Sequence, residues 1–253
     1  MAKGTVRIEC WLLSISSVVS TKSSTIIISN LSSRNNRFEY VRDYLNRYGY
    51  FNGQDGSGLT IEDVNSLKFI FDLNKFQAYY KLENTKTIND ETLEVIKTPR
   101  CGMTDIAASF NLKRTFWRKN PILWHFCGAT NKQIKVATVA FQLWEKYANF
   151  NVQQSFENPN IIISFKYKDL KERDSKRCGF TLDNSELAHA CFPPADDSVS
   201  EIHINQNKDW NEELYDISKD KLSLFITLAH KIGHAIGIDH SPIHQSLMHS
   251  VYH

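Results

Sequence analysis

The feature that most constrains this chain is a group of three histidines within residues 227–248. His230 and His234 are four residues apart, so on a helix their side chains share one face. Gly237 then permits a sharp turn, often with a positive φ, that a residue carrying a Cβ adopts less readily. Such a turn brings His240 back toward the first two histidines. The pattern therefore predicts a helix and a turn whose three imidazoles point at one position.

Three nitrogen ligands with a fourth position open form the donor set of a catalytic zinc site. The full spacing, with Met248 eight residues after His240, matches the long signature of one class of zinc peptidases. Surface histidines on an ordinary helix explain neither Gly237 nor Met248. Lys231 stands where that signature has a glutamate. Three further histidines fit no position of the pattern and are expected to be exposed: His244, His249 and His253.

Length and composition limit the other possibilities. The 253 residues allow one large domain or a domain with a smaller companion, and an apolar content of 42% is sufficient for a core. The net charge is +2 and the basic residues are scattered, so we expect no nucleic-acid partner. No apolar run reaches the roughly 18 residues of a membrane helix, so we expect no transmembrane segment.

Residues 1–36 have the outline of a weak secretory signal. Lys3 and Arg7 precede an apolar patch over residues 11–19, and small residues follow it. Glu9 and the many serines do not fit such a signal. A secretory signal and a plain N-terminal extension therefore both stay open.

Hydrophobic periodicity divides the rest of the chain into two parts. Helical spacing of apolar residues predicts a small helical unit over residues 37–50, 61–82 and 88–98. Alternating or continuous apolar runs predict strands over residues 121–128, 160–167, 187–192 and 201–205. Two long helices are expected over residues 131–150 and 220–238. Strands mixed with long helices indicate helices layered on one twisted sheet.

A second motif, TPRCGMTDI at residues 98–106, contains the pattern Pro-Arg-Cys-Gly-x-x-Asp. It resembles the cysteine switch of matrix metalloproteinase zymogens, a family of metzincins. The resemblance implies that the Cys101 thiolate fills the fourth zinc position and keeps the enzyme latent. A soft thiolate is a strong ligand for zinc. Arg100 and Asp105 resemble the pair that braces this loop.

The resemblance extends over most of the chain. YLNRYGYF at residues 44–51 resembles the start of the family's propeptide, and residues 73–102 match its second half. LAHACFPP resembles the edge strand that lines the substrate cleft, where Leu187, Ala188 and Ala190 would offer backbone bonds to an extended peptide. The chain is most similar to short members without a haemopexin-like tail, such as those of plants and some invertebrates.

The resemblance implies an α+β fold in which a three-helix propeptide, residues 37–105, precedes a metzincin catalytic domain, residues 106–253. That domain would have a twisted, mostly parallel, five-stranded sheet and two long helices, with its C-terminal helix missing. The family is made of zinc endopeptidases that are secreted as zymogens. It implies a monomer with an extended peptide or protein as substrate or inhibitor.

Lys231 is the main departure from the family. The family's glutamate takes a proton from zinc-bound water, and a positioned base contributes about 100- to 10,000-fold. A charged ammonium cannot accept a proton, so we expect catalysis to be lost or very weak. A neutral amine could act as the base, or could reach the zinc and close the site.

The structural zinc site of the family is also altered. His189 and His203 match two of its four ligands, but no histidine stands at the first position. Asp169 or Asp174 could supply an oxygen instead, and the family's aspartate ligand falls on Lys176. A second zinc is therefore doubtful.

The neighbouring calcium site has lost its acidic residues. The family's Phe-Asp-Gly reads Phe-Thr-Leu over residues 180–182, and two acidic positions are Asn205 and Lys208. Calcium requires several oxygen ligands, so its binding is not expected. A disulfide between Cys178 and Cys191 would close this loop and stabilise the folded state by roughly 3 kcal/mol. Two ordinary buried cysteines are an equal alternative, and the state of the third, Cys127, stays open.

The wall of the substrate pocket retains only Tyr252 of the family's Met-Tyr-Pro-x-Tyr pattern after Met248. We therefore expect a poorly formed pocket. Three functions stay open: an active zymogen, a pseudoprotease with a closed Cys-His₃ zinc site, and a decaying truncated copy. Lys231 favours the last two over the first.

Overall fold

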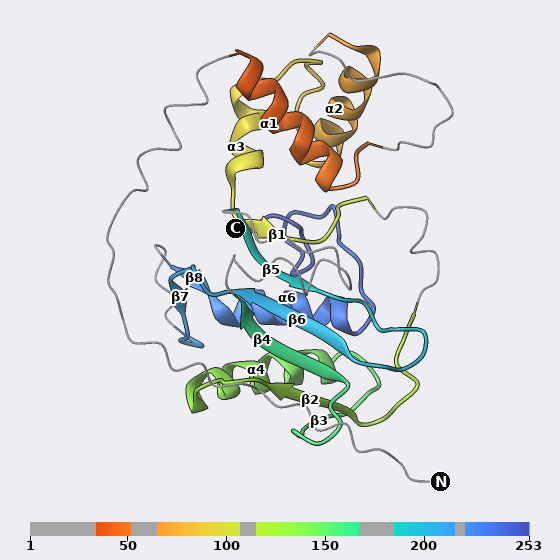
Figure 1. Cartoon of the computed structure of the whole chain (residues 1–253), viewed down its shortest axis with the longest axis vertical. Helices are drawn as coiled ribbons and strands as arrows, with labels where there is room; N and C mark the ends of the chain where they lie inside the picture. The colour runs from red at the N-terminus through yellow and green to blue at the C-terminus, as the bar shows by residue number, and fades with distance from the viewer. Residues whose placement is uncertain (1–33, 52–64, 107–114, 167–184, 216–220, 253) are drawn as a thin grey trace. The chain divides into compact units, whose positions relative to one another are not determined.

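The structure is a computed structural model, which describes residues 34–51, 65–106, 115–166, 185–215 and 221–252 (Figure 1). The chain forms two compact units. Among the described residues, the helical unit contains those within 34–98 and 104–106, and the sheet unit contains those within 99–103 and 115–252. The cysteine-containing segment Pro99–Met103 thus belongs to the sheet unit, whereas Asp105 belongs to the helical unit.

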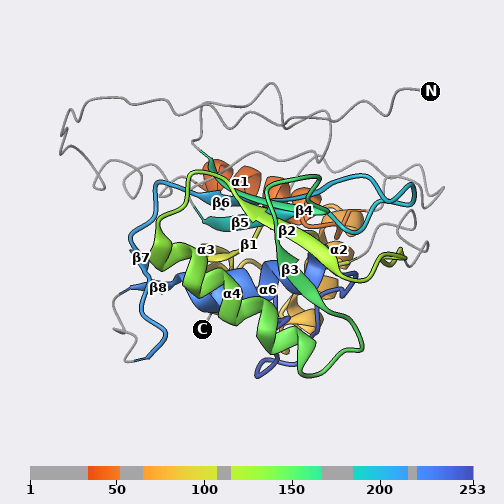
Figure 2. The same ribbon diagram turned by 90° about the horizontal axis from the view of Figure 1, so that it is seen from below.

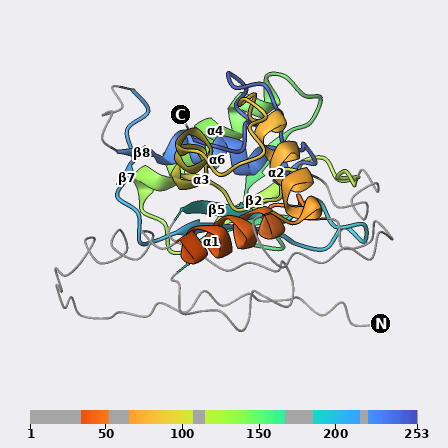
Figure 3. The same ribbon diagram turned by 90° about the horizontal axis from the view of Figure 1, so that it is seen from above.

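The helical unit has the three helices that the sequence predicts, and Figure 3 shows them from above. They are α1 (Arg34–Arg47), α2 (Leu67–Tyr79) and α3 (Asp90–Lys97). Helix α2 starts later than predicted because the Ser66 hydroxyl caps it, accepting a hydrogen bond from the Phe69 N–H. The Asn89 side chain caps α3 in the same way.

Aromatic and aliphatic side chains fill the core of the helical unit. Tyr50 and Tyr80 both donate from their hydroxyls to the Asp105 carboxylate, each at 2.8 Å. The backbone N–H of Asp105 donates to the carbonyl of Tyr48. These three contacts hold the end of the switch motif within the helical unit.

The sheet unit has a six-stranded sheet of order β1-β5-β6-β4-β2-β3. Its strands are β1 (Arg100–Cys101), β2 (Ile122–Phe126), β3 (Val152–Gln154), β4 (Ile161–Lys166), β5 (Glu186–Ala190) and β6 (Ser200–Asn205). Every pairing is parallel except that of β5 with β6. A two-residue ladder joins β7 (Trp210–Asn211) to β8 (Leu222–Ser223). The α+β class and the mostly parallel sheet are confirmed, and β1 is a sixth strand beyond the five expected.

Two long helices, α4 (Asn131–Glu145) and α6 (Leu224–Ala235), lie against the same side of the sheet, as Figure 2 shows from below. Thr130 and Gln133 form a capping box at the start of α4. The indole N–H of Trp144 donates to the carbonyl of Ala229 at 2.7 Å and joins the two helices. Trp124 of β2 stacks on Phe141 of α4 in the core between sheet and helices.

In the part of the chain that the structure describes, no helix is long and apolar enough to cross a membrane. The expected exposure of His249 is wrong, because its side chain is buried, whereas His244 is exposed. His253 lies outside the described residues.

Gly233 fixes how closely the turn that contains Met248 approaches α6. A Cβ at this position would lie 2.5 Å from the Met248 Sδ and 2.9 Å from Cζ2 of Trp144. We expect Gly233→Ala to destabilise the protein by about 1–3 kcal/mol, as overpacking of a core usually does, despite the higher helix propensity of alanine. Urea unfolding measures this loss. It should be smaller in a Met248→Ala background, and an equal loss in both backgrounds would show that the Met248 contact is not the cause.

Candidate metal centre

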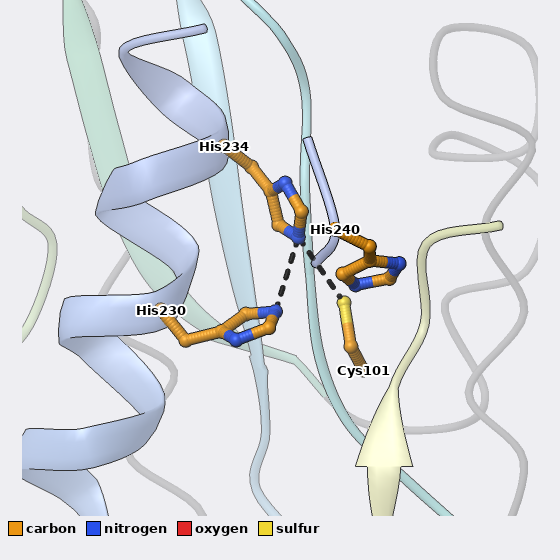
Figure 4. Close-up of side chains that lie close together, drawn as sticks. All are labelled: Cys101, His230, His234 and His240. Atoms are coloured by element: carbon orange, nitrogen blue, oxygen red, sulfur yellow. Dashed lines mark hydrogen bonds between the residues drawn. The ribbon is translucent and has the colours of Figure 1, made fainter. Parts of the chain in front are cut away.

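Helix α6 carries His230 and His234 on one face, as the spacing predicts (Figure 4). Gly237 follows with φ +107°, and a Cβ there would lie 2.8 Å from the carbonyl oxygen of Thr115. The turn requires glycine for both reasons. It brings His240 to the first two histidines, with ring centroids 5.4 Å from His230 and 4.7 Å from His234.

The sulfur of Cys101 completes a group of four potential metal ligands with the three histidines, and their ligand atoms all lie within 4.8 Å of one another. The Nε2 atoms of His230 and His234 are 3.0 Å apart, and the Cys101 Sγ is 3.5 Å from the His234 Nε2. Zinc–ligand bonds of tetrahedral sites imply about 3.3 Å between two nitrogens and about 3.6 Å between nitrogen and sulfur. These two separations are close to those values, so the cluster is compatible with one tetrahedral zinc ion.

Backbone carbonyls orient two of the imidazoles. The Nδ1 of His230 donates to the carbonyl of Leu247 at 2.7 Å, and the Nδ1 of His234 donates to that of Ile238 at 2.8 Å. In neutral rings the facing Nε2 atoms are then both acceptors, which cannot hydrogen-bond to each other. A cation between them resolves this conflict, and a carbonyl behind the ring is the usual support of a metal-binding histidine.

The electrostatics keep these histidines neutral. Burial lowers the pKa of His234 to about 3, and burial likewise lowers the pKa of His230. Neutral imidazole is the form that binds a metal ion.

Cys101 is the free cysteine among the described residues, and its side chain is buried. Burial alone would raise the pKa of its thiol. The pKa nevertheless lies well below its usual value, chiefly because the charge of Lys231 lowers it. Its sulfur accepts hydrogen bonds from the Met103 N–H at 3.3 Å and from the Lys231 Nζ. The sulfur therefore has the thiolate character of a zinc ligand.

Lys231 is only 1% exposed, and its ammonium group contacts the Cys101 sulfur. Burial lowers the pKa of Lys231, whereas Cys101 and the buried Glu186 raise it and Arg100 lowers it. This contact could not be predicted from the motifs alone. The opposite charges of two motif residues were its signal, but the two residues are 130 positions apart.

The switch segment is bound as a strand between two walls of the sheet unit. On one side β1 pairs parallel with β5, and the Gly102 N–H donates to the carbonyl of Ala188 at 2.9 Å. On the other side the Cys101 N–H donates to Ser250, and the Tyr252 N–H donates to Pro99, each at 2.8 Å. Figure 1 shows β1 beside β5. The chain itself thus occupies the edge at Ala188, which was expected to bind an extended peptide.

A pocket of about 430 Å³ lies beside the metal centre. Its walls include Leu187, Ile226, Thr227, Leu247, Val251 and Tyr252. The Tyr252 hydroxyl accepts a hydrogen bond from the Ser223 N–H at 2.7 Å, which fixes the outer wall. A pocket is thus present where the sequence predicts a poorly formed one, and its fitness for substrate stays a prediction. Leu187 faces this pocket, whereas Ala190 pairs with Ile202 of β6.

The two histidines assigned to a second zinc face each other across β5 and β6. His189 pairs with His203, whose Nε2 lies 3.0 Å from the Glu201 carboxylate. Burial lowers the pKa of His189 to about 3. The other candidate ligands, Asp169 and Asp174, lie outside the described residues, as do Lys176 and residues 180–182. That this second zinc site has lost ligands therefore stays a prediction.

At Asn205, where the resemblance implies an acidic calcium ligand, the amide donates to the Glu186 carbonyl at 2.8 Å and ties β6 to β5. Cys191 is disulfide-bonded, and so is Cys127. Cys178 lies outside the described residues, so its pairing with Cys191 stays a prediction.

The brace between Arg100 and Asp105 also stays a prediction, because the two residues belong to different units. Within its own unit, Arg100 donates from Nε to the carbonyl of Cys101 at 2.9 Å and from a terminal nitrogen to the carbonyl of Met103 at 3.3 Å. These bonds close the turn that presents the Cys101 sulfur.

Comparison with known proteins identifies this architecture. The model of the peptidase M10 family, the matrixins, matches residues 116–253, which is more than half of the chain. The chain belongs to the matrixin family. Matrixins are zinc metalloproteases that act on peptides or proteins, and the cluster of Cys101 with three histidines is compatible with zinc.

Similar proteins are matrix metalloproteinases and a hatching enzyme. Matrix metalloproteinase-18 of Xenopus laevis is 29% identical over 85% of this chain and 45% of its own length. Matrix metalloproteinase-20 of Homo sapiens is 27% identical over 92% and 47%. The hatching enzyme of Paracentrotus lividus is 25% identical over 85% and 35%. The chain therefore spans less than half the length of each of these relatives.

The depressed pKa values of His230 and His234 predict a pH dependence for the zinc-free protein. In the unfolded chain both residues take up a proton near pH 6.5, whereas the folded protein keeps His234 neutral to about pH 3. Their contribution to stability is thus present above about pH 6.5 and is lost as the pH falls toward 3. Thermal unfolding in a chelator should show this decline. It should be shallower in His234→Asn, and an equal decline in both proteins would contradict the assignment to His234.

Proposed function

We propose that this chain is a latent, zinc-binding matrixin that does not hydrolyse peptide bonds as its sequence stands. The observation that carries the proposal is the position of Lys231. Its ammonium group stands where the family has a carboxylate base, and it contacts the Cys101 sulfur. A protonated amine offers a donor where peptide hydrolysis requires an acceptor.

Four side chains would hold the zinc: His230, His234, His240 and Cys101. A bound zinc ion would supply Lewis acidity and a cross-link between α6 and the switch segment. With four protein ligands the site is closed, which is the pattern of a structural rather than a catalytic zinc. Met248 packs beneath this centre, as its position in the family motif implies. We assign one zinc to this site and none to the lost calcium position.

The organisation of a zymogen follows from the same resemblance. We assign residues 37–105 to the propeptide and residues 106–253 to the metallopeptidase domain, with Arg100 and Asp105 supporting the switch. Relatives that align over 85–92% of the chain support this assignment. We also propose that the protein is secreted and monomeric, and that residues 1–36 include the signal for export.

The pocket beside the metal favours a second candidate function, that of a pseudoprotease. A pocket of about 430 Å³ with apolar walls is suited to one side chain of a peptide or of a protein inhibitor. Binding there does not require the Lys231 position to act as a base. An intact pocket favours this function over a decaying copy of the gene.

Peptide cleavage tests the loss of the base. In the full chain, Cys101→Ser opens the fourth ligand position but leaves Lys231, whereas Cys101→Ser/Lys231→Glu also restores the family's carboxylate. We expect the double variant to cleave a fluorogenic peptide at least about 100-fold faster than the single variant, which is the lower range for a general base. Zinc content and circular dichroism are recorded for both. Cleavage by Cys101→Ser at the rate of the double variant would overturn the proposal.

Metal analysis tests the ligand set. The native chain should contain one zinc at this centre, and His234→Ala should lose it after dialysis, because three ligands remain without the tetrahedral set. His244→Ala, which changes an exposed histidine near the same centre, is the matched control and should keep its zinc. Equal zinc content in the two variants would exclude His234 as a ligand.

A further inference from the structure

The sulfur of Cys101 has donors of its own besides any metal ion. The Met103 N–H and the Lys231 Nζ both donate to it. Cys101 and Lys231 are 5% and 1% exposed, so water cannot readily replace the Lys231 donor. A buried hydrogen bond between charged partners is among the stronger ones in proteins.

The backbone around the sulfur is already fixed, so the Lys231 contact acts on a positioned group. Arg100 and Gly102 donate their N–H groups to Ser185 and Ala188, and Cys101 donates to Ser250. The sulfur therefore approaches α6 from a bound strand rather than from a loose loop. Lys231 follows His230 directly on α6, and its Nζ donates to this sulfur.

The side chain of residue 231 decides whether its interaction with the Cys101 thiolate is attractive or repulsive. An ionised glutamate has only acceptors, so it cannot hydrogen-bond to a thiolate and repels it. With glutamate, only the metal ion and the Met103 N–H would attract the sulfur. With lysine, a cation of the protein itself attracts the sulfur, whether or not a metal ion is bound.

We propose that Lys231 is a positioning residue that keeps Cys101 and its segment seated at the metal centre without the metal. Lys231 replaces the glutamate base of the family. By the same substitution, Cys101 stays bound at the metal centre whether or not zinc is present. This inference rests on the proposed function, in which Cys101 is the fourth ligand of a closed site.

The test measures how fast iodoacetamide alkylates Cys101, followed by peptide mapping with mass spectrometry. The full chain is compared with Lys231→Met, which keeps the unbranched apolar stem of the side chain but removes the donor. Both proteins are measured with zinc and again after a chelator has removed the zinc. Rates are divided by those in denaturant, where the two proteins should react alike. Lys135→Met makes the same change at an exposed position of α4 and is the matched control.

Without zinc, we expect Cys101 to react at least about tenfold faster in Lys231→Met than in the native chain, as expected for loss of a hydrogen bond to a charged group. Loss of the Lys231 charge also raises the pKa of the thiol, which alone would slow alkylation, so an acceleration reports exposure of the sulfur. Lys135→Met should behave as the native chain. Equal rates in native and Lys231→Met proteins without zinc would overturn the inference. Circular dichroism and zinc content establish that Lys231→Met is folded. If it is not, Lys231→Glu, which restores the residue of the family motif, should show the same or a larger acceleration.

The zinc-loaded samples separate this inference from the proposed function. If Cys101 of the native zinc-loaded chain reacts as fast as in denaturant, the closed site itself is wrong. A second outcome is that Cys101 is protected in the zinc-loaded chain but reacts equally fast in the native and Lys231→Met proteins after zinc removal. In that case only the proposed role of Lys231 is wrong.

Discussion

The position of the Cys101 sulfur is the constraint on which the metal centre depends. The sulfur lies where three imidazole nitrogens converge, and it is brought there by a two-residue strand between β5 and the segment that contains Ser250. Neither wall alone would fix it, because one pairs with Gly102 and the other with Cys101 and Pro99. The same strand covers the sheet edge at Ala188. Closure of the metal centre and occupation of this edge are therefore one structural event.

The charge of residue 231 decides whether the Cys101 thiolate is repelled or attracted at the metal centre. A thiolate beside a buried carboxylate is an arrangement held by the metal ion against repulsion. A thiolate beside a buried ammonium is an ion pair, and removing one member of a buried pair costs about 3–5 kcal/mol because the other charge stays behind. The burial of Lys231 is thus explained by Cys101 and by Glu186, which both favour its charged form. Lys231 and Cys101 must be considered as a pair in any substitution.

The histidine spacing and Gly237 were sufficient to predict that the three imidazoles converge, because each feature acts within one helix and one turn. The main helices and strands followed from local periodicity for the same reason. Strand β1, the Lys231–Cys101 contact and the pocket could not be predicted in this way, because each depends on segments far apart in the sequence. The burial of His249 was missed for a related reason: a motif indicates which residues bind, but not how the following turn packs.

Lysine at position 231 does more than remove the base. Many residues lack a base, and an apolar or amide side chain at position 231 would abolish proton transfer at a smaller cost of burial. Lysine brings a charge that only a partner can make tolerable inside the protein. In this structure the partner is the Cys101 sulfur at the metal centre. Random loss of function would not be expected to place a lysine at the one position where this partner is available. The substitution is therefore better explained as a second support of closure than as simple loss of a catalytic residue.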